Sequence, residues 1–146
     1  MKIVVQRVSR AQVDVDGKTV GRIGYGALIF LGVAHGDREE DAAYLARKVS
    51  QLRMFSDVQG KMNLAAADVS AAFLVISQFT LYGNCRKGRR PSFDEAAAPE
   101  RGRTLYESFV QCLKDLGFVT QTGIFGAHMA VDFVNDGPVT FILESL

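Results

Sequence analysis

The sequence has only two cysteines and two histidines in 146 residues, and this scarcity narrows the sites that the chain can hold. Cys85 falls in a polar loop and Cys112 in a helical pattern. They form no metal-ligand spacing, so a reducing compartment is the natural interpretation. A serine–histidine–acid triad needs a histidine beside a nucleophile. His128 lies inside a predicted strand, where a catalytic role is not favoured, and for His35 a structural role is as good an interpretation as a chemical one.

Several motifs are also missing. The sequence contains no HxxxH, CxxC or EF-hand spacing, and no GxGxxG or GxxxxGK[ST] motif. The three glycines within residues 21–26 follow a hairpin signal and lead into a strand, so they lack the helix that a phosphate loop needs. We therefore expect neither a metal ion nor another cofactor.

No apolar run is long enough for a membrane span, because the longest covers only residues 27–34. The start of the chain carries charges too early and too often for a signal peptide. Net charge is +1, so any RNA contact must come from a local patch. We expect one cytoplasmic domain over residues 1–146, with neither a membrane nor DNA as partner. A mean hydropathy of +0.09 suits a buried subunit interface and a compact core equally well.

Hydrophobic periodicity predicts about eight strands and two helices without βαβ alternation. This favours an α+β fold, with a mostly antiparallel sheet or barrel-like layer and two main helices. Asp37 is the predicted cap of the first helix, which should end near Arg53, and Pro99 should open the second, which Gly117 ends. The predicted strands cover residues 2–8, 11–16, 19–23, 27–34, 72–76, 118–122, 127–134 and 139–143.

Four cations lie within five residues, at Arg86, Lys87, Arg89 and Arg90. Phosphate groups attract such a cluster, and each neutralised phosphate releases counterions. A solvated basic loop is the alternative. Because the cluster follows a predicted buried strand, where an active-site edge is plausible, both interpretations stay open on local grounds.

Ser77, Gln78, Phe79 and Thr80 lie where that buried strand meets the basic loop. Serine and threonine are candidate nucleophiles, and glutamine is a candidate donor to an oxyanion. No general base is visible beside them in the sequence. The alternative is that these side chains satisfy backbone groups at the end of a strand.

Gly137-Pro138 follows Asn135-Asp136, which locally predicts a turn between two strands. An X–Pro bond is cis in only about 5–6% of cases in folded proteins, so local sequence favours a trans turn.

Two spaced signatures resemble the D-aminoacyl-tRNA deacylase family, and residues 1–16 are similar to the family's opening. The sequence departs mildly from the pattern of this family at position 133, where it has a phenylalanine and a leucine is expected. The first signature is Ser77-Gln78-Phe79-Thr80-Leu81 with Lys87-Gly88-x-Arg90-Pro91-x-Phe93. The second is Gly126-Ala127-x-Met129-x-Val131 with Asn135-x-Gly137-Pro138-Val139-Thr140.

The resemblance implies a homodimer that acts on aminoacyl-tRNA, with active sites at the subunit interface. It implies that Gly137-Pro138 is a cis dipeptide inserted into the partner's pocket, where its carbonyls accept hydrogen bonds from the substrate's ammonium group. An L-residue would drive its side chain into this backbone and be rejected. Glycine has no chirality to reject, so some action on glycyl-tRNA is expected. Arg7 is implied to support the dipeptide, and Met129 to line the pocket.

The resemblance also implies the chemistry. An aminoacyl ester is already activated, so the vicinal ribose hydroxyl can help water to attack, with backbone N–H groups near Phe79 and Thr80 as oxyanion donors. A covalent role for Thr80 ranks lower. Gln78 and Ser77 would position the terminal adenosine, and Arg86–Arg90 the acceptor-stem phosphates. The alternatives are an RNA-binding module without chemistry and a related editing enzyme of altered chirality with a trans bond.

Overall fold

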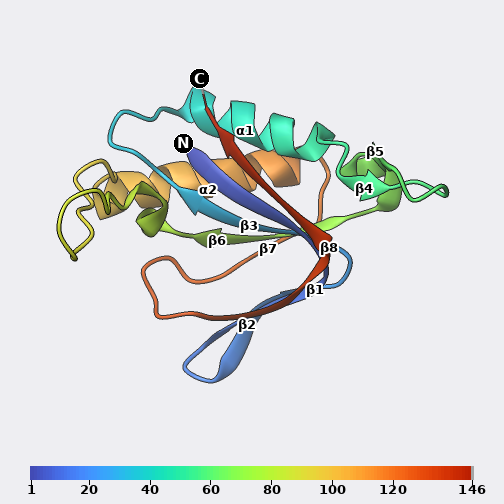
Figure 1. Ribbon diagram of the computed structural model, residues 1–146, viewed down its shortest axis with the longest axis horizontal. Helices are drawn as coiled ribbons and strands as arrows, with labels where there is room; N and C mark the ends of the chain where they lie inside the picture. Colours follow the sequence, from blue (N-terminus) through green and yellow to red (C-terminus); the bar gives the residue numbers. More distant parts are fainter. Residues whose placement is uncertain (146) are drawn as a thin grey trace.

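The computed structural model describes residues 1–145 and shows a curved, mixed six-stranded sheet with two helices packed on one face (Figure 1). The strand order is β2-β1-β3-β6-β7, and β8 pairs with β1. The expected α+β fold with two main helices is confirmed, and the expected domain of residues 1–146 extends one residue beyond the described part. The sheet strands are β1 (Lys2–Val15), β2 (Lys18–Ile23), β3 (Gly26–Gly32), β6 (Ala72–Ser77), β7 (Thr120–Thr122) and β8 (Ala130–Glu144).

The hairpin of β1 and β2 follows from its turn residues. Asp16 and Gly17 both have positive φ, at 50° and 74°. A two-residue turn of this kind matches the twist of antiparallel strands, and an Asp-Gly pair tolerates it best. The predicted turn is therefore confirmed, although the predicted strands 2–8 and 11–16 form one continuous strand that ends at Val15, and Asp16 lies in the turn.

Three of the five strand pairs in the sheet are antiparallel, but the other two are parallel, so the prediction that βαβ units are absent was wrong. β3 runs parallel to β6, and β6 runs parallel to β7. Parallel neighbours need long crossover connections, and each connection here contains a helix. The first crossover also contains β4 (Phe55–Ser56), β5 (Met62–Leu64) and the short 3₁₀ helix η1 (Ala66–Val69), which masked the βαβ pattern in the sequence.

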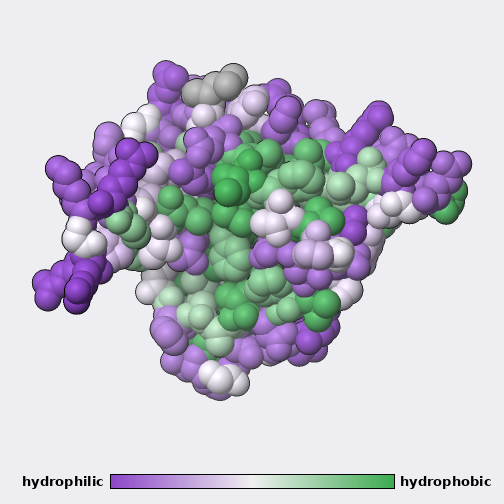
Figure 2. Space-filling model, viewed as in Figure 1, coloured by the Kyte–Doolittle hydropathy of each residue, from purple (hydrophilic) through white to green (hydrophobic). Residues whose placement is uncertain are grey.

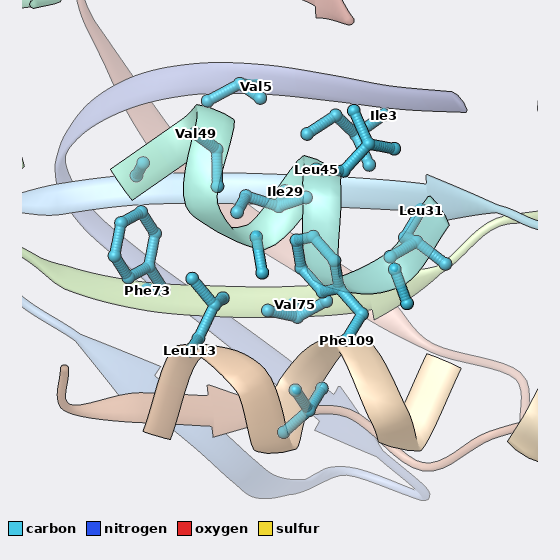
Figure 3. Close-up of a cluster of buried hydrophobic side chains, with 14 of the residues drawn as sticks. Ile3, Val5, Ile29, Leu31, Leu45, Val49, Phe73, Val75, Phe109 and Leu113 are labelled. Carbon is cyan, nitrogen blue, oxygen red and sulfur yellow. The ribbon is translucent and has the colours of Figure 1, made fainter. Parts of the chain in front are cut away.

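The two helices, α1 (Glu39–Gln51) and α2 (Pro99–Asp115), lie side by side over the sheet. Figure 3 shows Leu45 of α1 and Phe109 of α2 directed into the layer between the helices and the strands. Both side chains are completely buried. Within the described residues, neither helix has the length and apolar character required to cross a membrane.

A second, smaller core lies on the opposite face of the sheet. Ile3 and Val5 of β1 pack in the core beneath the helices, whereas Val8, Ala11 and Val13 pack in the second core. The pairing register of β1 with β8 shifts between Val8 and Arg10. Val8 faces the second core by ordinary strand alternation, and the extra residue after it places Ala11 and Val13 on that same face.

Asp37 does not cap α1, contrary to the prediction. The residue at the cap position is Arg38, whose N–H donates to the Asp41 carboxylate at 2.8 Å. The Asp37 carboxylate instead accepts hydrogen bonds from the Met1 amine at 2.5 Å and from the Ala34 N–H at 2.6 Å. The Asp37 carboxylate therefore pairs with the distant Met1 amine and does not cap the helix.

The predicted strands 127–134 and 139–143 are not separate, because both fall largely within one long strand, β8, which begins only at Ala130. His128, predicted to lie inside a strand, precedes β8 and is exposed. Pairing with β1 holds the two parts of β8 in line, which local sequence does not reveal.

Candidate active site

A cavity of about 580 Å³ opens where β6 ends, beside the first turns of α2. Its walls come from four separate parts of the chain: the end of β3, the end of β6 with the residues that follow it, residues 93–106 including the start of α2, and residues 125–131, which lead into β8. The lining residues are Leu31, Val33, Ile76, Ser77, Gln78, Phe79, Phe93, Ala96, Ala97, Pro99, Gly102, Tyr106, Phe125, Gly126, Ala127, His128, Met129 and Val131.

The segment Ser77–Thr80 forms one lip of this cavity. Ser77 ends β6, the Gln78 N–H donates to the Leu31 carbonyl at 2.7 Å, and the 3₁₀ helix η2 (Phe79–Tyr82) begins at once. The first hydrogen bond of this turn runs from the Leu81 N–H to the Gln78 carbonyl. The N–H groups of Phe79 and Thr80 precede it, so the turn itself gives them no acceptor.

Ser77, Gln78 and Phe79 line the cavity, but Thr80 does not, and its side chain is exposed. Its hydroxyl oxygen accepts a short hydrogen bond from the Gln78 amide. In the described residues no histidine or carboxylate forms a hydrogen bond with that hydroxyl.

The floor of the cavity is built by a buried tyrosine. The Tyr106 hydroxyl donates to the Val75 carbonyl at 2.8 Å, and burial raises the pKa of the phenol well above its usual value. The group therefore stays protonated and acts as a fixed donor to β6. Residues 1–145 contain no group of three or more His, Cys, Asp or Glu side chains arranged to hold a metal ion.

Met129 and the aromatic side chain of Phe125 also line the cavity. Phe125 packs against Tyr106 with ring centroids 5.8 Å apart, and the Arg103 guanidinium lies 5.2 Å from the Phe125 ring centroid. A Cβ at Gly102 would lie 3.5 Å from the Phe125 ring, an ordinary contact distance, so the ring lies close to this turn of α2.

The basic loop projects beside this cavity. Arg86, Lys87, Arg89 and Arg90 are all exposed, and within residues 1–145 none of them forms an ion pair. Figure 2 shows the loop as a strongly hydrophilic tip at the left of the molecule.

The base of the loop is closed by two backbone hydrogen bonds between Asn84 and Ser92, of 2.7 and 3.0 Å. Phe93 follows and meets Phe79 edge to face, with centroids 4.9 Å apart. This aromatic contact joins the basic loop to the lip of the cavity.

Gly137-Pro138 lies on a separate feature, an excursion of β8. Gln6 pairs with Thr140 and Val8 pairs with Asn135, so residues 136–139 all lie opposite the single residue Arg7. We call residues 136–139 the β8 excursion. The Gly137-Pro138 peptide bond is cis, and both residues are exposed.

Arg7 binds Asp136, the first residue of the β8 excursion. It is only 7% exposed, although it occupies a strand position where an apolar residue is expected. Its Nε donates to the Asp136 carbonyl at 3.0 Å and lies 3.3 Å from the Asp136 carboxylate. Its Nη1 donates to the Met54 carbonyl at 2.9 Å and to Ser56 Oγ at 3.2 Å.

The structure therefore divides the predicted site residues into two groups. Ser77, Gln78, Phe79 and Met129 share the cavity, with Thr80 just outside it. Gly137 and Pro138 lie on the excursion and Arg7 lies opposite it on β1, and in the described part of the chain none of these three lines the cavity.

Sequence reasoning did not identify the contribution of α2. Tyr106 and Gly102 look like ordinary helix positions, because a stripe of apolar side chains is usually core. A signal existed in Gly102, since a glycine inside a helix costs about 1 kcal/mol relative to alanine and usually has a packing reason.

Comparison with known proteins identifies a family. The family model described as D-Tyr-tRNA(Tyr) deacylase matches residues 4–144. A D-aminoacyl-tRNA deacylase of Geobacter sulfurreducens is 59% identical over 145 residues, covering 99% of this chain and 95% of the relative. One of Thermotoga petrophila is 57% identical, covering 99% of this chain and 97% of the relative.

Solved structures agree with the fold. A structure titled c-Myc DNA Unwinding Element Binding Protein has a TM-score of 0.93 at 39% identity, covering 100% of this chain and 99% of that chain. A structure described as a probable eukaryotic D-amino acid tRNA deacylase has a TM-score of 0.86 at 16% identity, covering 98% of each chain. The second likeness concerns the fold alone.

Proposed function

We propose a reaction site for this chain, which belongs to the D-Tyr-tRNA(Tyr) deacylase family and is a D-aminoacyl-tRNA deacylase, a hydrolase. The ester substrate is cleaved at the cavity beside Ser77–Phe79. The acyl C–O bond between the amino acid and the terminal ribose breaks, water supplies the hydroxyl group, and free D-amino acid and tRNA are released. The observation that carries this proposal is the cavity at the end of β6, with backbone donors at its lip.

The backbone donors are the N–H groups of Phe79 and Thr80. They precede the first hydrogen bond of η2 and suit the stabilisation of a carbonyl oxygen that becomes negative during attack. The ester is activated by its own leaving group, and the vicinal ribose hydroxyl assists the attacking water.

The tRNA end is bound by both parts of the first signature. Ser77 and Gln78 line the cavity and present polar side chains to the terminal adenosine. Arg86, Lys87, Arg89 and Arg90 contact acceptor-stem phosphates, and their lack of carboxylate partners in residues 1–145 supports this role.

We further propose that Gly137-Pro138 selects chirality in the cavity of a second copy of the chain. Its exposure, and its separation from the cavity of its own chain, support action in trans. The carbonyls of the dipeptide accept hydrogen bonds from the substrate ammonium, and the backbone blocks an L side chain. Glycyl-tRNA, which has no side chain to block, is a second substrate.

A homodimer is required by this arrangement. Figure 2 shows an apolar area in the middle of the molecule, where β8 crosses the front of Figure 1. On β8, Val134 is 42% exposed and Ile142 is 66% exposed. Exposed apolar residues that cluster on one face are typical of subunit interfaces. Light scattering should give twice the chain mass, and a monomer with full activity would contradict selection in trans.

The activity test compares D-Tyr-tRNA with L-Tyr-tRNA in parallel reactions, followed by loss of the ester. We expect rapid loss from the D-substrate, slow loss from the L-substrate, and measurable loss from glycyl-tRNA. Equal rates for D and L would contradict chiral selection. Salt-sensitive tRNA binding without ester loss would instead identify an RNA-binding module, the alternative that the basic loop favours.

A further inference from the structure

We propose that Asn135 and Ser56 are positioning residues, which hold the β8 excursion from its two ends and thereby set the discrimination between D- and L-substrates. This inference rests on the proposed function of Gly137-Pro138. Neither side chain touches the cavity of its own chain in the described structure, so both act through the dipeptide.

The excursion needs such support because it leaves the sheet. Residues 136–139 lie opposite one residue of β1, so regular strand pairing does not fix their backbone. A selector made of backbone carbonyls must be held to within about 0.5 Å to distinguish two enantiomers. The hydrogen bonds that set its position must therefore come from side chains.

Asn135 closes the excursion from within β8. Its Oδ1 accepts from the Val139 N–H at 3.0 Å, and its Nδ2 donates to Thr140 Oγ1 at 3.0 Å. One side chain thus joins the residue before the excursion to its last residue and to the strand beyond. Gln6 of β1 also donates to Thr140 Oγ1, at 3.2 Å, which ties this end to the sheet.

Ser56 acts at the other end, through Arg7. The Arg7 guanidinium spans the Asp136 carbonyl on one side and Ser56 Oγ with the Met54 carbonyl on the other. The β4–β5 register shifts between Phe55, which is completely buried, and Ser56, which reaches Arg7. The hairpin therefore orients the cation that holds the residue before Gly137.

The two supports make different demands on a substituted side chain. At position 135 an aspartate retains an acceptor for the Val139 N–H, and its second oxygen can accept from the Thr140 hydroxyl. An alanine loses both contacts. At position 56 an alanine removes one of two anchors of Nη1, since the Met54 carbonyl remains.

The experiment measures kcat and KM for D- and L-Tyr-tRNA with the full-length N135A, N135D and S56A proteins. We expect N135A to lower the D/L ratio of kcat/KM about tenfold, the factor expected for loss of one to two hydrogen bonds. S56A should lower it about threefold. N135D should recover most of the ratio, and the KM for tRNA should stay unchanged in all three.

Two control variants separate positioning from general loss of stability. Asn63 of β5 is exposed and follows Met62, the pairing partner of Ser56, but it is not among the hydrogen-bond partners of Arg7, and Ser50 of α1 donates only to the Arg47 carbonyl. N63A and S50A should keep the wild-type D/L ratio. An N135A protein with the wild-type ratio, or with equal losses for D and L that N135D does not restore, would overturn the proposal.

Amide hydrogen exchange supplies a readout that does not depend on activity. The Val139 amide should exchange faster in N135A than in the wild type and remain protected in N135D. If the wild-type protein fails to deacylate D-Tyr-tRNA, the proposed function is wrong. Unchanged Val139 exchange in N135A would instead refute the support by Asn135 itself.

Discussion

The cavity at the end of β6 and the β8 excursion are built in opposite ways. The cavity is lined mostly by apolar side chains and backbone, with few polar side chains, among them Ser77, Gln78 and His128. The excursion contains no cavity, yet a buried arginine, an asparagine and a serine fix its backbone with hydrogen bonds.

This difference shows that the hydrogen-bonding side chains are concentrated around the β8 excursion. An activated ester needs little help from a nucleophile, so the reaction site requires mainly space and a few backbone donors. Discrimination between enantiomers requires a wall in a defined place, because a displaced wall admits both. We therefore expect substitutions in the excursion to have larger effects than substitutions of the cavity hydroxyls.

The largest effect is expected for Gly137→Ala. Gly137 has a φ of +140°, and an added Cβ would lie 2.7 Å from Val139 Cγ2 and 3.0 Å from the Val139 nitrogen. Such backbone strain costs about 1–3 kcal/mol, so we expect kcat/KM for D-Tyr-tRNA to fall about 100-fold, with a lower D/L ratio. Steady-state assays on both enantiomers measure it.

Gly17→Ala is the matched control for that variant. Gly17 also has positive φ, but an added Cβ there would have no neighbouring atom within 4 Å. Its D/L ratio should stay at the wild-type value. An unchanged ratio in Gly137→Ala would show that the excursion is not the selector.

Arg7→Met should have the second largest effect. Methionine fills the space of the arginine stem but leaves the carbonyls of Asp136 and Met54 without their donor. We expect about a 30-fold fall in kcat/KM for the D-substrate and a loss of about 1–3 kcal/mol in the free energy of unfolding. Urea denaturation and kinetics measure the two quantities.

The control for Arg7 is Arg10→Met on the same strand. Arg10 pairs with Asp132, and both side chains are more than half exposed. An exposed ion pair contributes about 0–1 kcal/mol, so this variant should resemble the wild type. Equal effects of the two substitutions would argue against a special role for Arg7.

Substitutions in the basic loop test whether the surface beside the cavity binds tRNA. Replacing Arg89 and Arg90 with glutamine should weaken tRNA binding about tenfold and reduce the slope of log affinity against log salt by about 1 per cation. The D/L ratio should not change, because phosphate contacts do not sense chirality. Lys18→Gln, in the β1–β2 hairpin, is the control, and a slope identical to the wild type in the double variant would remove the loop from the RNA interface.

Thr80→Ala should have the smallest effect, less than about threefold in kcat. The Thr80 hydroxyl accepts from Gln78, does not line the cavity, and has no base hydrogen-bonded to it in the described residues. Single-turnover assays measure the chemical step. A loss of about 1,000-fold with intact folding would restore the covalent nucleophile and reverse the ranking of the two regions.

Much of the fold was predictable from local patterns. Asp16-Gly17 specifies its turn, Pro99 and Gly117 bracket α2, and the apolar run after Gly26 is a strand covered on both faces. Local patterns failed where distant partners decide. Asp37 is drawn away from the helix cap by Met1, and the parallel pairing of β3 with β6 depends on a long crossover that contains α1, β4, β5 and η1.

The candidate site also has features that local sequence predicts and features that depend on residues distant in the chain. The two signatures were visible as residues, and so was the absence of a triad or metal spacing around them. The wall contributed by Tyr106 and Phe125 was not visible, because a buried aromatic side chain has the same pattern in a core and beside a cavity.

By itself, the sequence determined the two helices, the Asp16-Gly17 turn, the basic loop and the two signatures, because these depend on residues close together in the chain. Only the tertiary structure decided that Arg7 lies buried opposite four residues of β8. It also decided that Ser77–Phe79 and Met129 share a cavity from which Gly137-Pro138 is separate in residues 1–145. The physical reason is that strand pairing and burial bring together residues far apart in the chain, and no local propensity encodes those partners.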